Sequence, residues 1–128
     1  MKLIIPHSLR KSEFLPNKKT FSLEILKAAA HKALCGVGTI IKSPKKVPKT
    51  SLEKLNLTSS QEAGRVLFLV QIEGQNNAIL LMLRAKNDKQ IGKNMTVKNQ
   101  KFANSLEKNI DLMIKDLLEK NYDEYPLS

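Results

Sequence analysis

Three cations stand at the ends of two apolar runs in the middle of the sequence. Residues 65–88 read RVLFLVQIEGQNNAILLMLRAKND; Arg65 begins the first run, and Arg84 and Lys86 close the second. If the two runs pair as a hairpin, these ends meet and the three cations become neighbours. Guanidinium groups bind phosphate in bidentate fashion, and aimed cations also stabilise charge that develops in a transition state. The spacing therefore makes Arg65, Arg84 and Lys86 a candidate anion site with groups suited to phosphate.

Two interpretations of this cluster stay open at the level of sequence. Like charges placed side by side repel each other unless an anion lies among them. In one interpretation the anion is the phosphate of a ligand. In the other, the cations extend into water or pair with Glu53, Glu62 or an acid of the last helix.

Alternation along the two runs predicts which side chains share a face of the hairpin. With EGQNN as the turn, Leu67 pairs with Arg84 and Arg65 with Lys86, or the register is shifted by two residues. One face is then wholly apolar, and the other is half apolar and ends in the cations. The apolar face comprises Val66, Phe68, Val70, Ile72, Ile79, Leu81, Leu83 and Ala85; the other comprises Arg65, Leu67, Leu69, Gln71, Glu73, Ala78, Leu80, Met82, Arg84 and Lys86.

The charge of the chain favours an acidic partner. The net charge is +10, and up to Leu106 there are 19 lysines and arginines against 6 acids, whereas the remainder has 3 against 6. Two lysine-rich segments flank the hairpin at the end where its cations gather, which favours phosphate over the alternatives. The candidate nucleic-acid contacts are Lys45, Lys46, Lys49 and Lys54 before the hairpin, and Lys89, Lys93 and Lys98 after it.

The order of elements predicts an α+β fold. A short apolar run over 2–5 is typical of a strand, 21–35 of a helix ended by Gly36, and 102–118 of an amphipathic helix. With the hairpin and a further strand near 52–57, this predicts an antiparallel sheet of three to four strands with helices on one face. We expect a single domain over 1–128, with an acidic tail at 121–128.

Several other chemistries find no support in the sequence. QIGKNMT lacks the first glycine of a phosphate-binding P-loop and has Asn94 where Ser or Thr should follow the lysine. His7 and His31 have no partner at useful spacing, and Cys35 is the single cysteine. We therefore expect no metal and no other cofactor. The single cysteine and the lack of a signal peptide or a long apolar stretch favour a cytoplasmic protein without membrane contact.

The second half of the chain resembles the RelE/ParE superfamily of bacterial toxins from toxin–antitoxin pairs. The resemblance rests on GRVLF (64–68), on LLMLRAKND (80–88) and on the order of strand, helix, basic loop, hairpin and helix. It implies a RelE-like fold and a metal-independent endoribonuclease that cleaves messenger RNA on the ribosome and inhibits translation. The resemblance makes Arg65, Arg84 and Lys86 the candidate catalytic residues: Arg65 would match the arginine of the central strand, and Arg84 or Lys86 the cation that ends the next one. A cognate acidic antitoxin would be the protein partner.

The sequence also departs from the pattern of the nuclease members. LEKLNL (52–57) offers only Lys54 where they often carry alternating lysines, and KNDKQIGKNM (86–95) lacks their tyrosine. Two alternatives therefore accompany the nuclease hypothesis. One is a non-catalytic RNA- or DNA-binding module that uses the same surface, and the other is a DNA gyrase inhibitor of the ParE type.

Overall fold

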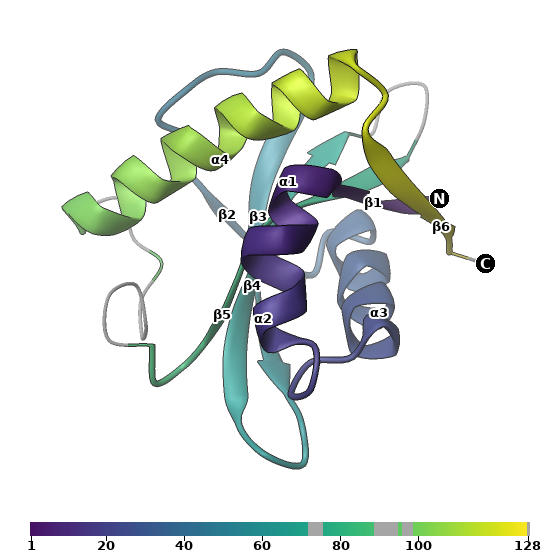
Figure 1. Cartoon of the computed structure of the whole chain (residues 1–128), viewed down its shortest axis with the longest axis vertical. Helices are drawn as coiled ribbons and strands as arrows, with labels where there is room; N and C mark the ends of the chain where they lie inside the picture. The colour runs from purple at the N-terminus through teal and green to yellow at the C-terminus, as the bar shows by residue number, and fades with distance from the viewer. Residues whose placement is uncertain (72–75, 89–94, 96–98, 128) are drawn as a thin grey trace.

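The structure is a computed structural model that describes residues 1–71, 76–88, 95 and 99–127. These residues form an α+β fold around a six-stranded sheet of order β2-β3-β4-β5-β1-β6 (Figure 1). The strands are β1 (Lys2–Pro6), β2 (Thr39–Ile41), β3 (Thr50–Thr58), β4 (Ala63–Gln71), β5 (Asn77–Ala85) and β6 (Tyr122–Pro126). The helical segments are α1 (His7–Leu9), η1 (Arg10–Phe14), α2 (Leu15–Asn17), α3 (Leu23–Leu34) and α4 (Gln100–Leu118).

The α+β prediction is confirmed, but the sheet is larger than expected and mixed. β1 runs parallel to β5 and antiparallel to β6, whereas β2 to β5 form an antiparallel meander. The acidic tail predicted over 121–128 is mostly strand β6, which pairs with β1 along its whole length. Its polar composition suits a strand at the edge of a sheet, which is why it resembles a tail.

Helices cover both faces of the sheet, so the prediction of helices on one face is wrong. α3 begins at the side-chain cap of Ser22 and packs its alanine-rich side against one face. α4 packs against the other face, which is also apolar because β4 places Leu67 and Leu69 there. None of the helices in the described residues combines the length and apolar character that crossing a bilayer requires.

The hairpin of β4 and β5 contains a β-bulge that changes which side chains share a face. Arg65 lies opposite Arg84, which is the predicted register shifted by two residues. The register then shifts once more, because Leu67 pairs with Met82 but Phe68 pairs with Leu80. The faces predicted for β4 and for 82–85 are confirmed, whereas those predicted for 78–81 are reversed: Ala78 and Leu80 belong to the core under α3, and Ile79 and Leu81 to the core under α4.

Gly64, which precedes Arg65, is required by close packing. A Cβ atom there would lie 2.5 Å from Cζ of Phe21 and 2.8 Å from the carbonyl oxygen of Arg84. Because one neighbour is backbone of the next strand, we expect Gly64→Ala to lower the free energy of unfolding by about 2 kcal/mol. Urea denaturation measures this loss.

Gly38→Ala is the matched control for this substitution. A Cβ atom at Gly38 would contact only side-chain atoms of Glu53 and Leu55, at 3.0 to 3.1 Å, so the neighbours need to shift less than they would at Gly64. Its expected cost is below about 1 kcal/mol, because alanine also restricts the unfolded chain. Equal losses for the two variants would contradict the role assigned to Gly64.

Candidate functional site

A row of polar side chains crosses three strands where the core under α4 ends. Asn56 of β3 lies opposite Arg65 of β4, and Arg65 lies opposite Arg84 of β5. Lys54 is two residues before Asn56 and therefore shares its face. We call Lys54, Asn56, Arg65 and Arg84 the basic row. Lys86 lies just past the end of β5, is exposed, and donates its backbone N–H to the carbonyl oxygen of Ala63.

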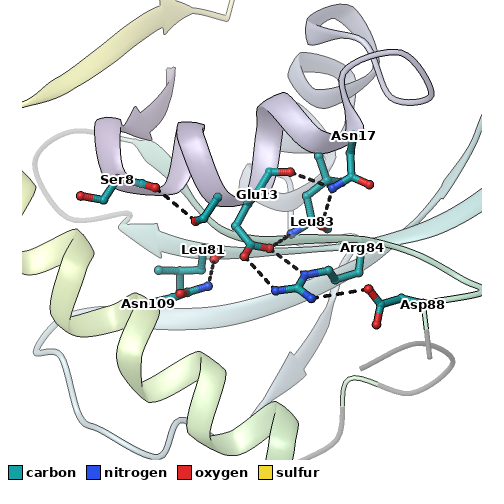
Figure 2. A network of polar contacts seen from close by, with 9 residues as sticks. Ser8, Glu13, Asn17, Leu81, Leu83, Arg84, Asp88 and Asn109 are labelled. Atoms are coloured by element: carbon teal, nitrogen blue, oxygen red, sulfur yellow. Dashed lines mark hydrogen bonds and ion pairs between the residues drawn. The ribbon is translucent and has the colours of Figure 1, made fainter. Parts of the chain in front are cut away.

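Arg84 is neutralised by acids of the protein itself. Its Nε and Nη2 atoms donate to the two carboxylate oxygens of Glu13, each at 3.0 Å, and Nη1 donates to Oδ2 of Asp88 at 3.5 Å (Figure 2). Burial alone would lower the pKa of Arg84, but hydrogen bonds and charge from Glu13 and Asp88 raise it above its ordinary value. Neither acid was among those expected to pair with the cations. Arg84 is thus a fixed, charged side chain that already has anionic partners.

Glu13 lies at this point because β5 needs partners for its backbone there. β1 pairs with β5 only as far as Ile79, so the rest of that edge has no neighbouring strand. Side chains replace it: Oε1 of Glu13 accepts from the Leu83 N–H at 3.0 Å, and Nδ2 of Asn17 donates to the Leu83 carbonyl at 3.0 Å. Asn109 of α4 donates to the Leu81 carbonyl at 2.8 Å (Figure 2). Buried backbone groups require such partners, so these side chains complete the sheet edge.

Further hydrogen bonds hold the segment that carries Glu13. The N–H and the hydroxyl of Ser8 both donate to Asp116 of α4, at 2.8 and 3.2 Å. Asn17 also donates to the backbone carbonyl of Glu13 at 2.8 Å. The carboxylate of Glu13, which is 2% exposed, is therefore held against β5 by a segment that is itself bonded to α4.

Arg65 differs from Arg84 in having no acidic partner in the described part of the chain. Its side chain is half-buried, and Nη1 donates only to the carbonyl oxygen of Gly64 at 3.3 Å. Within residues 1–71, 76–88, 95 and 99–127, no carboxylate lies within ion-pairing distance of it. Arg65 is thus the member of the basic row with charge available for a ligand.

The predicted lysine contacts lie in different surroundings. Lys45 forms an ion pair with Asp111 of α4, and this hydrogen bond and the carboxylate charge raise the pKa of Lys45. Lys46 and Lys49 are exposed in the segment between β2 and β3, whereas Lys54 belongs to the basic row. That segment enters β3 at Thr50, which pairs with Gln71 at the other end of β4 from Arg65. The expectation that the lysines before β3 lie at the end of the hairpin where its cations gather is therefore wrong, because β3 runs antiparallel to β4. The sites predicted at Lys89, Lys93 and Lys98 lie outside the described residues.

A small polar pocket adjoins the buried end of the basic row. Its volume is about 200 Å³, and it lies between the segment 8–13 and α4. Its lining residues are Ser8, Ser12, Glu13, Arg84, Ser105, Lys108, Asn109 and Leu112. Arg84 therefore belongs both to the basic row and to the wall of this pocket.

His7 takes part in a different cluster. Its Nε2 atom lies 3.2 Å from Oδ1 of Asp123 in β6, and Arg10 approaches the other carboxylate oxygen at 3.4 Å. The ring therefore pairs with an acid of the edge strand rather than joining the basic row. This pairing helps to hold β6 against the start of α1.

Glu53 is a buried acid with an incompletely satisfied carboxylate. It is 4% exposed, its Oε1 atom has no hydrogen-bond partner within the described residues, and a Cβ at Gly38 would come within 3.0 Å of that atom. Burial raises the pKa of Glu53, and a hydrogen bond from the backbone N–H of Gly38 only partly offsets this. The folded state thus binds a proton more tightly than the unfolded chain does.

Stability is therefore expected to fall as the pH rises from the ordinary value of 4.5 through the raised pKa of Glu53. Glu53→Gln, which stays neutral, should remove this part of the pH dependence and raise the free energy of unfolding at neutral pH. Urea denaturation at about pH 4 and pH 7 tests this. Glu107→Gln, at an exposed site on α4, is the control, and an unchanged slope for Glu53→Gln would contradict the prediction.

Sequence reasoning placed Arg65 and Arg84 together but missed the residues that surround Arg84. Glu13 lies in the basic segment SLRKSEF, and its partners are far away in the sequence. Asn109 interrupts the apolar side of α4, which was the one available signal of a polar contact there.

Comparison of the chain with protein-family models, curated proteins and solved structures finds no significant match.

Proposed function

We propose that this protein binds nucleic acid through the basic row. The observation that carries the proposal is Arg65: a half-buried guanidinium near the start of β4, without an acidic partner in the described residues, next to a second arginine. The net charge of +10 supports an anionic ligand. Three acids are withdrawn from the surface, because Glu13, Glu53 and Asp116 are buried.

The two arginines have different parts in this proposal. Arg84 is held by Glu13 and Asp88 and gives the row a fixed wall. Arg65 offers the donor pair that suits two phosphate oxygens. Lys54 and the exposed Lys86 add charge on either side, as contacts to a phosphate backbone require.

Fluorescence anisotropy with labelled oligonucleotides tests the proposal directly. The affinity should fall steeply with salt, because binding to phosphates releases counterions. Four phosphate contacts are expected, from Arg65, Lys54, Lys86 and one further lysine. A plot of the logarithm of affinity against the logarithm of salt concentration should then have a slope of about −2.8 for a single strand and about −3.6 for duplex DNA. An absence of binding at about 50 mM salt, for both RNA and DNA, would refute the proposal.

A toxin-type endoribonuclease is the second candidate, and the placement of Arg65 directly opposite Arg84 favours it. In such a site the arginines stabilise charge on the scissile phosphate, without metal.

Messenger RNA cut by the purified protein in the presence of translating ribosomes would support this candidate and the RelE/ParE resemblance. Salt-dependent binding that leaves RNA intact supports the binding module alone. Inhibited supercoiling with intact RNA would instead point to a gyrase inhibitor, and a co-purifying acidic protein to an antitoxin.

A further inference from the structure

The pocket beside Arg84 has polar groups that the fold does not use. Figure 2 shows four of its lining residues, Ser8, Glu13, Arg84 and Asn109. Both oxygens of Glu13 are occupied by Arg84 and by the Leu83 N–H, and the hydroxyl of Ser8 donates to Asp116. These residues form the rigid floor of the pocket rather than its binding groups.

Three other groups remain available to a ligand. Asn109 is 5% exposed, and its amide nitrogen is committed to the Leu81 carbonyl, so its amide oxygen is an acceptor without a protein partner in the described residues. In the same part of the chain, neither the hydroxyl of Ser105 nor the ammonium group of Lys108 has a protein partner. Leu112 adds an apolar wall. The pocket thus offers two donors, one acceptor and an apolar surface.

We infer that this pocket takes one unpaired base of a nucleic-acid strand whose backbone lies on the basic row, so that the ligand is single-stranded. The inference rests on the proposed function and goes beyond it. A volume of about 200 Å³ is smaller than pockets for drug-sized molecules and suits a single ring. The edge of a base carries carbonyl oxygens that suit Lys108 and Ser105, and N–H groups that suit the oxygen of Asn109.

The charge of the pocket favours a base over an isolated phosphate. Glu13 and Asp88 together offset Arg84, so Lys108 is the one lining cation without an acidic partner in the described residues. A phosphate ion here would lie close to the buried carboxylate of Glu13, and the repulsion would offset its attraction to the cations. A neutral base edge meets no such repulsion. In a duplex, base edges are already paired and cannot enter a pocket of this size.

Ser105→Leu tests the inference by filling the pocket from α4. Leucine is a good helix former, and Ser105 is only partly buried, so folding should be preserved. The probes are a single-stranded oligouridylate of about twelve nucleotides and an RNA duplex of the same length. We expect Ser105→Leu to weaken binding of the single strand about tenfold and to leave binding of the duplex unchanged. Asn104→Leu, the exposed neighbour on α4 that does not line the pocket, should bind both probes like the unsubstituted protein.

Lys108→Met gives a second measurement on the same pocket, since this exposed side chain tolerates substitution. It should also weaken the single strand more than the duplex. Overturning results are a duplex bound as tightly as the single strand, or equal losses on both probes. If such results occur while Arg65→Glu still abolishes binding, the pocket inference fails and the proposed function stands. If the unsubstituted protein binds neither probe, the proposed function itself fails.

Discussion

Replacing Glu13 with alanine is expected to lower the free energy of unfolding by about 3 kcal/mol. The substitution leaves the Arg84 guanidinium without two of its hydrogen bonds, and leaves the Leu83 N–H without an acceptor at the open edge of β5. Removing one partner of a buried ion pair costs far more than the pair contributes, because the other charge stays in a poorly solvated place. The Arg84 side chain keeps 23% of its surface exposed, so the loss lies at the low end for such pairs.

Urea denaturation of Glu13→Ala and of Glu24→Ala makes the comparison. Glu24 is an acid on α3 whose side chain is 82% exposed and whose nearest cation, Lys27, is 4.0 Å away. Its loss should change the free energy of unfolding by less than about 0.5 kcal/mol. A Glu13→Ala loss as small as this would show that Glu13 does not hold the sheet edge.

A double substitution separates the two roles of Glu13. Arg84→Met together with Glu13→Ala removes both charges of the pair, which leaves the Leu83 N–H without its acceptor and Asp88 without its arginine. The combined loss should be smaller than the sum of the two single losses, by about 1 to 3 kcal/mol. Strict additivity would mean that the carboxylate acts on the backbone of β5 alone.

The sequence carries enough information for the strands and for the meeting of the cations. Alternation in RVLFLVQ predicts the faces of β4 correctly, and it places Arg65 on the face where the structure has it. No pattern of polar and apolar residues in the sequence marks the position of the bulge in β5. ILLML (79–83) is continuously apolar because both faces of the sheet are buried there. Without polar residues in this run, the sequence does not show which side chains point to which face. Arg65 and Arg84 nevertheless end opposite each other, because the bulge lies between Arg84 and the turn.

The surroundings of Arg84 follow from topology, which local sequence patterns do not encode. Glu13 is needed only because β1 stops pairing with β5 at Ile79. That stop depends on Pro6, which has no N–H to donate and after which the chain turns into α1. A proline after a short strand is visible in the sequence, but which strand then loses its neighbour is not. The acid that fills the gap is therefore identifiable only in three dimensions.

Replacing Arg65 with glutamate is expected to weaken binding of single-stranded RNA by at least about a hundredfold. The substitution removes the guanidinium at the centre of the basic row and places a carboxylate where a phosphate would lie. Folding should not suffer, because Arg65 faces Arg84 directly and the substitution removes a like-charge pair. Thermal unfolding followed by circular dichroism checks this, and anisotropy at about 50 mM salt measures the affinity.

Lys32→Glu is the matched control for Arg65→Glu. It makes the same change in net charge, but Lys32 is an exposed residue of α3, which covers the opposite face of the sheet (Figure 1). Its effect should be limited to a few-fold loss that disappears as salt screens the long-range field. Arg65→Gln adds a variant without a repulsive charge and should lose about tenfold, with a shallower salt slope. Equal losses for Arg65→Glu and Lys32→Glu would show that net charge, rather than the basic row, attracts the ligand, and would remove the basis for assigning this face as the binding site.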